Sequence, residues 1–472
     1  MKKKAEVVFI PSPGVGHLVS TLEFAKLLVN RDDRLQITVL VIKFSPTSDT
    51  DAYTDPIASE RLRVINLPEP HIVPSTSDRG STTATLLESQ KPHVREAVSN
   101  LTATGGGSLA AFVVDMFCTT MIEVAREFRV PSLVFFTSGA ALLGLMLHLH
   151  TLKERDSTAE LQDELAIPCF ANPVPSNTLP SVVLRKEWEQ FFMRYGRGLK
   201  EANGFIVNSF EELESHAVHS FSDPALSLGL PLYPVGPILN PEPKMDKGTA
   251  DDILKWLDDQ PPSSVVFLCF GSRGAFDEEQ VTEIARALED SGARFLWSLR
   301  KPPPNGTMAE PPSDYPLPEL AAVLPEGFLD RTAGIGRVIG WAPQAQVLAH
   351  PATGGFVSHC GWNSILESIY FGVPIATWPL FAEQQTNAFQ LVRELKMAVE
   401  IALDYRVEMD EGRNFLLTAD RIERGIRSVL DKDGEIRKKV KEMSEKSRKT
   451  LLEGGCSYTH LTRLIDYIME QV

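Results

Sequence analysis

The sequence predicts an α/β protein with two doubly wound domains. In both halves of the chain, short runs rich in Val, Ile and Phe alternate with segments of helical periodicity. Residues 6–10, for example, have the composition of a strand, and the apolar residues Leu18, Leu22, Ala25 and Val29 then recur at helical spacing. Alternation of this kind gives parallel sheets with helices on both faces. At 472 residues the chain is also longer than one ordinary core.

The two predicted domains are separated by a stretch without periodicity. Proline and glycine interrupt residues 234–248, so we expect domains at 1–240 and 253–455, a linker at 241–252 and a last segment at 456–472. The strands expected in the first domain are 6–10, 36–42, 63–67, 110–114, 133–136 and 205–207, and those in the second are 265–270, 295–299, 338–340, 355–358, 375–378 and 398–403. The proline-rich residues 302–318 are expected to form a surface loop.

Composition excludes several classes of function. The chain has 47 Lys and Arg against 62 Asp and Glu, a net charge of −15, which disfavours nucleic acid and anionic membranes as partners. The five cysteines are scattered, which favours free thiols in a reducing compartment. The apolar run after Lys4 is too short for a signal peptide, and no run is long enough to span a membrane. We therefore expect a cytoplasmic protein, and a monomer.

Polar residues follow the strand expected at 355–358. His359, Cys360 and Gly361 form a sharp turn, and Asn363 and Ser364 open a helix. Backbone N–H groups and the helix dipole make such a turn an anion site. Asn363 and Ser364 could equally be ordinary helix caps.

Neighbouring residues fit the rest of a nucleotide. Glu367 lies one helical turn beyond Asn363, and its carboxylate could accept hydrogen bonds from two ribose hydroxyls. Trp341 precedes a proline-fixed loop, where an indole can stack on a base, and Glu383 and Gln384 could contact sugar hydroxyls. Each has a structural alternative, with Trp341 in the core and Glu383 and Gln384 as first-turn helix residues.

His17 and Asp115 are the candidate catalytic pair. His17 follows the first strand and a Pro- and Gly-rich turn, and Asp115 ends the strand expected at 110–114. Histidine is the side chain that can act as a base near neutral pH. Asp115 could accept from Nδ1–H of His17 and stabilise the imidazolium. Alternatively, His17 is structural and Asp115 is a helix N-cap.

Residues 341–384 resemble the signature box of plant family-1 UDP-glycosyltransferases, with the run from His359 to Ser364 at its centre. The resemblance extends over the chain, and includes Gly271 and Ser272 after a strand, residues 208–214 and residues 14–17. It implies a GT-B fold, with two facing Rossmann-like domains, an inter-domain cleft, the acceptor in the N-terminal domain and the donor in the C-terminal one. It also implies that the final helix, residues 458–469, returns to the N-terminal domain.

The resemblance assigns roles to individual residues. It implies His17 as general base oriented by Asp115, without a metal or cofactor, in an inverting transfer of glucose from UDP-glucose to a small acceptor. The donor would be held at uracil and ribose by Trp341, Ala342, Gln344 and Glu367, at the diphosphate by Ser272, His359, Asn363 and Ser364, and at the sugar by Trp362, Glu383 and Gln384. A terminal glutamine in the box, as at Gln384, is usual in glucose users.

The acceptor pocket is expected in the N-terminal half, with Phe117, Phe135 and Thr137 among its residues. An apolar pocket of this kind suits a flavonoid, phenolic, terpenoid or hormone.

A dehydrogenase is a weak rival function because Val19 occupies the place of the third small residue in the dinucleotide fingerprint. A serine hydrolase lacks its Gly-x-Ser-x-Gly elbow. A non-catalytic sugar-nucleotide binder or an epimerase on the same fold remains the alternative.

Overall fold

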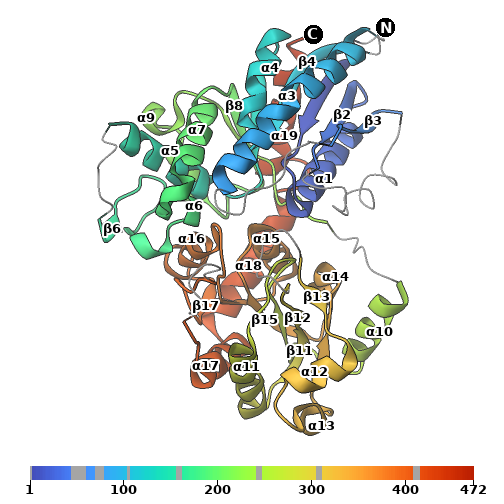
Figure 1. Cartoon of the computed structure of the whole chain (residues 1–472), viewed down its shortest axis with the longest axis vertical. Helices are drawn as coiled ribbons and strands as arrows, with labels where there is room; N and C mark the ends of the chain where they lie inside the picture. The colour runs from blue at the N-terminus through green and yellow to red at the C-terminus, as the bar shows by residue number, and fades with distance from the viewer. Residues whose placement is uncertain are drawn as a thin grey trace. The chain divides into compact units, whose positions relative to one another are not determined.

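The computed structural model describes residues 3–43, 60–69, 79–103, 107–155, 162–240, 247–303, 311–407 and 415–472. The chain divides into two compact units (Figure 1). The first comprises Met1–Pro173, Val182–Asn240 and Lys449–Val472, and the second comprises Val174–Ser181 and Pro241–Arg448. Helix α10 (Lys247–Asp258) occupies the second half of the expected linker.

The first unit is built on a seven-stranded sheet with the order β3-β2-β1-β4-β5-β8-β9. All of its paired strands are parallel. The strands are β1 (Ala5–Ile10), β2 (Leu35–Val41), β3 (Leu62–Asn66), β4 (Ser108–Asp115), β5 (Ser132–Phe136), β8 (Gly204–Val207) and β9 (Leu232–Pro234). The six strands predicted for this half are present.

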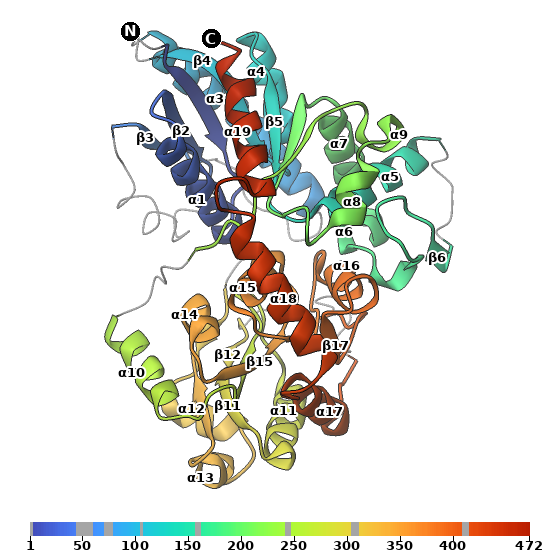
Figure 2. The same cartoon turned by 180° about the vertical axis from the view of Figure 1, so that it is seen from behind.

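Helices cover the first sheet on both faces. They are α1 (Val15–Arg31), α3 (Arg79–Ala103), α4 (Ile122–Glu127), α5 (Ala140–Arg155), α6 (Ser181–Leu184), α7 (Glu189–Lys200), α8 (Ser215–Ser220), α9 (Pro224–Ser227) and α19 (Cys456–Met469). Helices α3 and α4 lie in front of the strands in Figure 1, and α19 lies in front of them in the opposite view of Figure 2.

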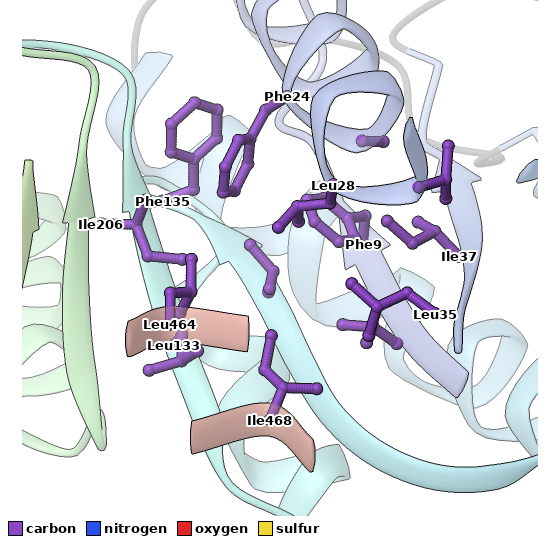
Figure 3. Close-up of a cluster of buried hydrophobic side chains, with 14 of the residues drawn as sticks. Phe9, Phe24, Leu28, Leu35, Ile37, Leu133, Phe135, Ile206, Leu464 and Ile468 are labelled. Carbon is purple, nitrogen blue, oxygen red and sulfur yellow. The ribbon is translucent and has the colours of Figure 1, made fainter. Parts of the chain in front are cut away.

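One hydrophobic cluster joins the C-terminal helix to the first sheet. Leu464 and Ile468 of α19 pack with Leu133 of β5 and with Phe24 of α1 in the same buried cluster (Figure 3). Each of these side chains is no more than 1% exposed. Apolar burial of this extent stabilises by about 25 cal/mol per Å² removed from water, so α19 is an integral part of the first unit.

The second unit has a six-stranded parallel sheet with the order β14-β11-β10-β15-β16-β17. Its strands are β10 (Val265–Cys269), β11 (Arg294–Ser298), β14 (Gly336–Ile339), β15 (Thr353–Ser358), β16 (Ile375–Thr377) and β17 (Ala398–Glu400). Its remaining helices are α11 (Glu278–Ser291), α12 (Leu317–Val323), α13 (Phe328–Thr332), α14 (Gln344–Ala349), α15 (Trp362–Phe371), α16 (Gln384–Phe389), α17 (Ala419–Val429) and α18 (Glu435–Lys449), and the π-helical turn Gln390–Glu394 follows α16. The six strands predicted here are present, with ends that differ by one to three residues.

The proline-rich residues 302–318 are not entirely a loop, and the prediction was wrong there. Ser313–Asp314 forms strand β13, which pairs antiparallel with β12 (Arg300–Lys301), and α12 begins at Leu317. Residues 304–310 lie outside the described part. All five cysteines are free, as expected. None of the helices in the described ranges combines the length and apolar character needed to cross a membrane.

Candidate functional site

The first group of predicted site residues lies at the point where the strand order of the first sheet reverses. Strands β1 and β4 are neighbours there, with Ile10 opposite Val114. The connections that leave their carboxyl ends diverge to opposite sides of the sheet, which creates the crevice in which open α/β sheets bind ligands. His17 lies in the first turn of α1, after β1, and Asp115 is the last residue of β4.

His17 and Asp115 are hydrogen-bonded. Nδ1 of His17 lies 2.8 Å from Oδ2 of Asp115 and 3.0 Å from Oγ1 of Thr137. The other carboxylate oxygen of Asp115 accepts from the backbone N–H of Phe117 at 3.0 Å. The Asp115 side chain is fully buried, whereas that of His17 is 28% exposed. A carboxylate at Nδ1 favours the tautomer that carries its proton there, so the lone pair is on Nε2.

Aromatic rings extend from His17 along one side. The ring centre of Phe117 lies 5.4 Å from that of His17, 6.0 Å from that of Phe191 and 5.8 Å from that of Tyr195. The buried hydroxyl of Tyr195 has no hydrogen-bond partner, and burial, with Asp115 nearby, raises its pKa well above the usual value. Sequence reasoning missed Phe191 and Tyr195, because both fit the apolar face of a helix.

Phe135 is a core residue, which corrects its expected place in the acceptor pocket. Its ring lies 4.9 Å from that of Phe24, and the side chain is 1% exposed within the cluster drawn in Figure 3. Phe135 lies inside β5 and packs in the core, whereas Thr137 follows the end of the strand.

The second group lies at the corresponding reversal in the second sheet. Strands β10 and β15 are neighbours, with Cys269 opposite Ser358 at their carboxyl ends. Gly271 and Ser272 follow β10, and His359 follows β15. The side chain of Ser272 is exposed.

The imidazole of His359 is enclosed by two glycines. A Cβ atom on Gly271 or on Gly361 would lie 2.5 Å from its Nε2, a distance that neither backbone can accommodate. Gly271 also has a φ of +73°, which disfavours other residues. Burial lowers the pKa of His359 to about 4, although a hydrogen bond to the backbone of Cys269 opposes the shift. At this pKa His359 is neutral and has one N–H, which bonds to the backbone of Cys269. Its Nδ1 is buried without a partner.

The start of α15 provides backbone amides beside this histidine. Gly361 is the N-cap residue and provides no side-chain cap, and the first amides of a helix lack intrahelical acceptors. Nε2 of Gln344 donates to Oγ of Ser364 at 2.9 Å and to Oε2 of Glu367 at 2.8 Å. Burial raises the pKa of Glu367 to about 7, while the bond from Gln344 lowers it. The glycine, serine and carboxylate of the α15 N-terminal region are thus grouped with Gln344, the first residue of α14.

Trp341 is held by contacts that the sequence did not predict. Its side chain is 36% exposed, and its backbone N–H donates to Oδ1 of Asp314 at 3.0 Å. Arg300 pairs with Asp314 at 2.9 Å, and its guanidinium carbon lies 5.0 Å from the centre of the indole. Because Arg300 and Asp314 belong to the paired strands β12 and β13, only the hairpin brings them to Trp341.

The remaining predicted donor residues lie in the same unit. Ala342 and Trp362 are buried at 9% and 4% exposure, and Asn363 is partly exposed. Glu383 is the N-cap residue of α16. Gln384 is 4% exposed, and its Oε1 accepts from the backbone N–H groups of residues 380 and 381 at 2.9 and 3.0 Å. Its Nε2 is therefore the atom that could contact a ligand.

Comparison with known proteins decides the family. The family model for UDP-glucoronosyl and UDP-glucosyl transferases matches residues 241–408. The chain is 55% identical over 488 residues to a putative UDP-glucose flavonoid 3-O-glucosyltransferase 3 from Fragaria ananassa, covering 99% of this chain and 100% of the relative. The chain belongs to the plant family-1 UDP-glycosyltransferases.

Solved structures of plant UDP-glycosyltransferases have the same fold. A Siraitia grosvenorii transferase in complex with UDP is 46% identical, with a TM-score of 0.86 over 99% of this chain and 100% of the other. Medicago truncatula UGT71G1 complexed with UDP-glucose is 41% identical, with a TM-score of 0.87 over 99% and 98% of the two chains. The predictions of a GT-B fold and of a UDP-sugar-dependent glycosyltransferase are confirmed.

The comparisons do not favour a dehydrogenase, a hydrolase, an epimerase or a non-catalytic binder. Among the residues that the structure describes, no group of three or more His, Cys, Asp or Glu side chains has an arrangement that could hold a metal ion. The two groups of predicted site residues lie at the switch points, the places where the strand order of each sheet reverses.

Proposed function

We propose that this enzyme transfers glucose from UDP-glucose to a hydroxyl of a small aromatic acceptor, with inversion at the anomeric carbon. The observation that carries the proposal is the 2.8 Å contact between Nδ1 of His17 and buried Asp115 at a switch point of the sheet. The name of the Fragaria relative supports glucose as the sugar and a flavonoid as the acceptor. The rings of Phe117 and its neighbours offer aromatic surface beside the proposed base.

UDP is proposed to bind along the second switch point. The indole of Trp341 stacks on uracil, Ala342 and Gln344 contact uracil and ribose, and Glu367 accepts from the ribose hydroxyls. His359 and the first turn of α15 receive the diphosphate, together with Ser272, Asn363 and Ser364. The unpartnered, buried Nδ1 of His359 supports this role, because buried polar atoms are normally hydrogen-bonded. Trp362, Glu383 and Gln384 contact the sugar.

The reaction is a single displacement. The acceptor oxygen attacks C1 of glucose from the side opposite UDP, its proton moves to Nε2 of His17, and the bond between C1 and the phosphate oxygen breaks. UDP departs with the bonding electron pair, and the imidazolium then loses its proton to solvent. Positioned proton transfer of this kind contributes typically about 10²–10⁴ in rate. Asp115 keeps Nε2 available and stabilises the imidazolium.

Hydrogen bonds are proposed to stabilise the departing UDP without a metal. His359 stays neutral at pH 7 because burial lowers its pKa to about 4, so it has a single N–H to donate. We propose that this proton leaves the backbone of Cys269 for Nδ1, the nitrogen without a partner, and is donated to a phosphate oxygen. The amides and dipole of the α15 N-terminus favour the same negative charge. Oriented donors of this kind typically account for about 10²–10³ in rate each.

Replacing the proposed base tests the function. UDP release is measured with UDP-glucose, with and without a phenolic acceptor, for the wild type, His17→Ala and the exposed control His219→Ala. We expect acceptor-dependent release in the wild type and the control, and a loss of about 10²–10⁴ in His17→Ala with UDP affinity unchanged. Undiminished turnover, or an equal loss of UDP binding, would refute the role of His17. Conversion of UDP-glucose without an acceptor would point to an epimerase.

The acceptor and the cellular setting are proposed more broadly. A phenolic, terpenoid or hormone acceptor would suit the same apolar surroundings as a flavonoid. A cytoplasmic location and a monomeric state remain predictions from composition.

A further inference from the structure

Residues Val174–Ser181, here called the strap, belong to the second unit although the chain on either side belongs to the first. The strap is anchored, because Val174 and Leu179 are fully buried and Thr178 is 2% exposed. Sequence analysis placed this stretch in the N-terminal domain. Its membership of the second unit raises the question of what it does there.

Arg406 holds the strap by three hydrogen bonds. Its guanidinium donates to Oγ of Ser181 at 2.8 Å, to the carbonyl of Asn177 at 3.0 Å and to the carbonyl of Leu179 at 2.5 Å. Nδ2 of Asn177 donates to Oδ2 of Asp404 at 2.9 Å. A planar guanidinium with several donors suits this arrangement, and an ammonium group would not reproduce it.

The strap in turn holds both sides of the proposed sugar contacts. Its Ser181 backbone N–H donates to the carbonyl of Ala382 at 3.2 Å, and Oγ1 of Thr386 donates to the carbonyl of Thr178 at 2.6 Å. Ala382 has a φ of +60°, a conformation that costs a residue with a side chain free energy and persists only where contacts impose it. Residues 383–384 lie between these two attachment points.

The segment that carries Arg406 is also hydrogen-bonded to the turn that contains Glu383 and Gln384. Val407 N–H donates to the carbonyl of Leu380 at 2.9 Å, and Nε2 of Gln385 donates to the carbonyl of Tyr405 at 2.7 Å. The turn formed by residues 380–386 is therefore bonded to the strap and to residues 405–407, and Arg406 joins the two supports.

We infer that Arg406 is a positioning residue for sugar recognition, acting through the strap on the orientation of Glu383 and Gln384. This inference rests on the proposed sugar-binding role of those two residues. Small displacements of positioning groups can reduce rate by about 10²-fold. In the proposed donor site, UDP does not contact the turn formed by residues 380–386, so loss of Arg406 should separate sugar recognition from UDP binding.

The test compares Arg406→Ala and Arg406→Lys with Arg393→Ala, a control that removes an exposed ion pair to Glu400 in the same unit. For each variant we would measure kcat and KM for UDP-glucose and UDP-galactose, the inhibition constant of UDP and the melting temperature. Thr386→Val loosens the strap from its other attachment with little change in side-chain volume, and serves if Arg406→Ala does not fold.

We expect Arg406→Ala to lower kcat/KM for UDP-glucose by about tenfold and to reduce the preference over UDP-galactose, with UDP inhibition within about twofold of the wild type. Thr386→Val should shift the same ratio in the same direction. An equal rise in the UDP inhibition constant, or kinetics like those of Arg393→Ala, would overturn the inference. If Glu383→Ala left UDP-glucose kinetics intact while Arg406→Ala did not, the proposed sugar role of the turn would be wrong instead.

Discussion

Substitution of Asp115 by asparagine tests the proposed catalytic pair with little change in shape. In the native site, Oδ1 of Asp115 accepts from the backbone N–H of Phe117 and Oδ2 lies beside Nδ1 of His17. Only the amide oxygen of asparagine can accept from Phe117, so the amide NH₂ would face Nδ1. Nδ1 would then accept, the proton would move to Nε2, and the proposed base would be lost.

The size of the effect follows from the charge that is removed. Opposite unit charges about 4 Å apart interact by roughly 4 kcal/mol at an effective dielectric constant of 20, which corresponds to about 10³ in rate. The change of tautomer adds to this, and the same change in a serine-hydrolase triad costs about 10⁴. Thr137 can accept from Nδ1 at 3.0 Å and offsets part of the loss. We expect kcat to fall by about 10³.

Steady-state kinetics with a series of phenols would measure this loss. UDP affinity, from calorimetry, should stay within about twofold because Asp115 and the donor residues belong to different units. With an acceptor that is already ionised at the assay pH, proton removal is unnecessary and the defect should shrink to about tenfold. Thr137→Val, which removes an uncharged contact to the same nitrogen, should lose about tenfold or less. A kcat for Asp115→Asn within fivefold of the wild type, or a defect independent of acceptor acidity, would refute the mechanism.

Two predictions concern the donor site. Burial raises the pKa of Glu367 to about 7 from an ordinary 4.5, so its contribution to folding stability is present below about pH 4.5 and is lost as the pH rises through 7. Ribose hydroxyls favour the ionised carboxylate. UDP affinity, measured by calorimetry, should therefore rise about tenfold from pH 6 to pH 8. Glu367→Gln should abolish that rise, and a pH dependence retained in the variant would contradict it. Arg300→Met removes the cation near Trp341 and the ion pair with Asp314, so UDP should bind about tenfold more weakly. Arg331→Met, which breaks an exposed ion pair with Glu289, is the control. Equal UDP affinities for the two variants would show that Arg300 does not help Trp341 to bind UDP.

The alternation of strands and helices could be predicted because it depends on local patterns. Val265 and its neighbours form a continuous apolar run, and β10 occupies it. The hairpin of β12 and β13 could not be predicted, because two residues per strand carry no periodicity and the pairing depends on Arg300 and Asp314. The strap has the composition of a loop, and it belongs to the second unit through hydrogen bonds to residues about two hundred positions away, Arg406 among them.

The candidate site could be predicted where chemistry follows directly after a strand. Strand ends made His17 and Asp115 candidates, and the family resemblance favoured the catalytic pair over the structural alternatives. The structure brings Nδ1 and Oδ2 within 2.8 Å. Phe135 was misassigned because a phenylalanine in a buried strand and one at its end look alike in sequence. The low pKa of His359 follows from burial that only the folded chain shows.

The two switch points have the same backbone arrangement and opposite electrostatics. After β4, buried Asp115 places a negative charge beside an imidazole, which favours a positive charge on His17. After β15, glycines enclose the imidazole of His359, whose burial lowers its pKa to about 4 and keeps it neutral. A carboxylate beside His359 would repel the diphosphate proposed to bind there, and removal of the one beside His17 would remove the proposed base. The parallel sheets provide both positions, and the residues at each strand end decide which proposed step of the transfer each position suits.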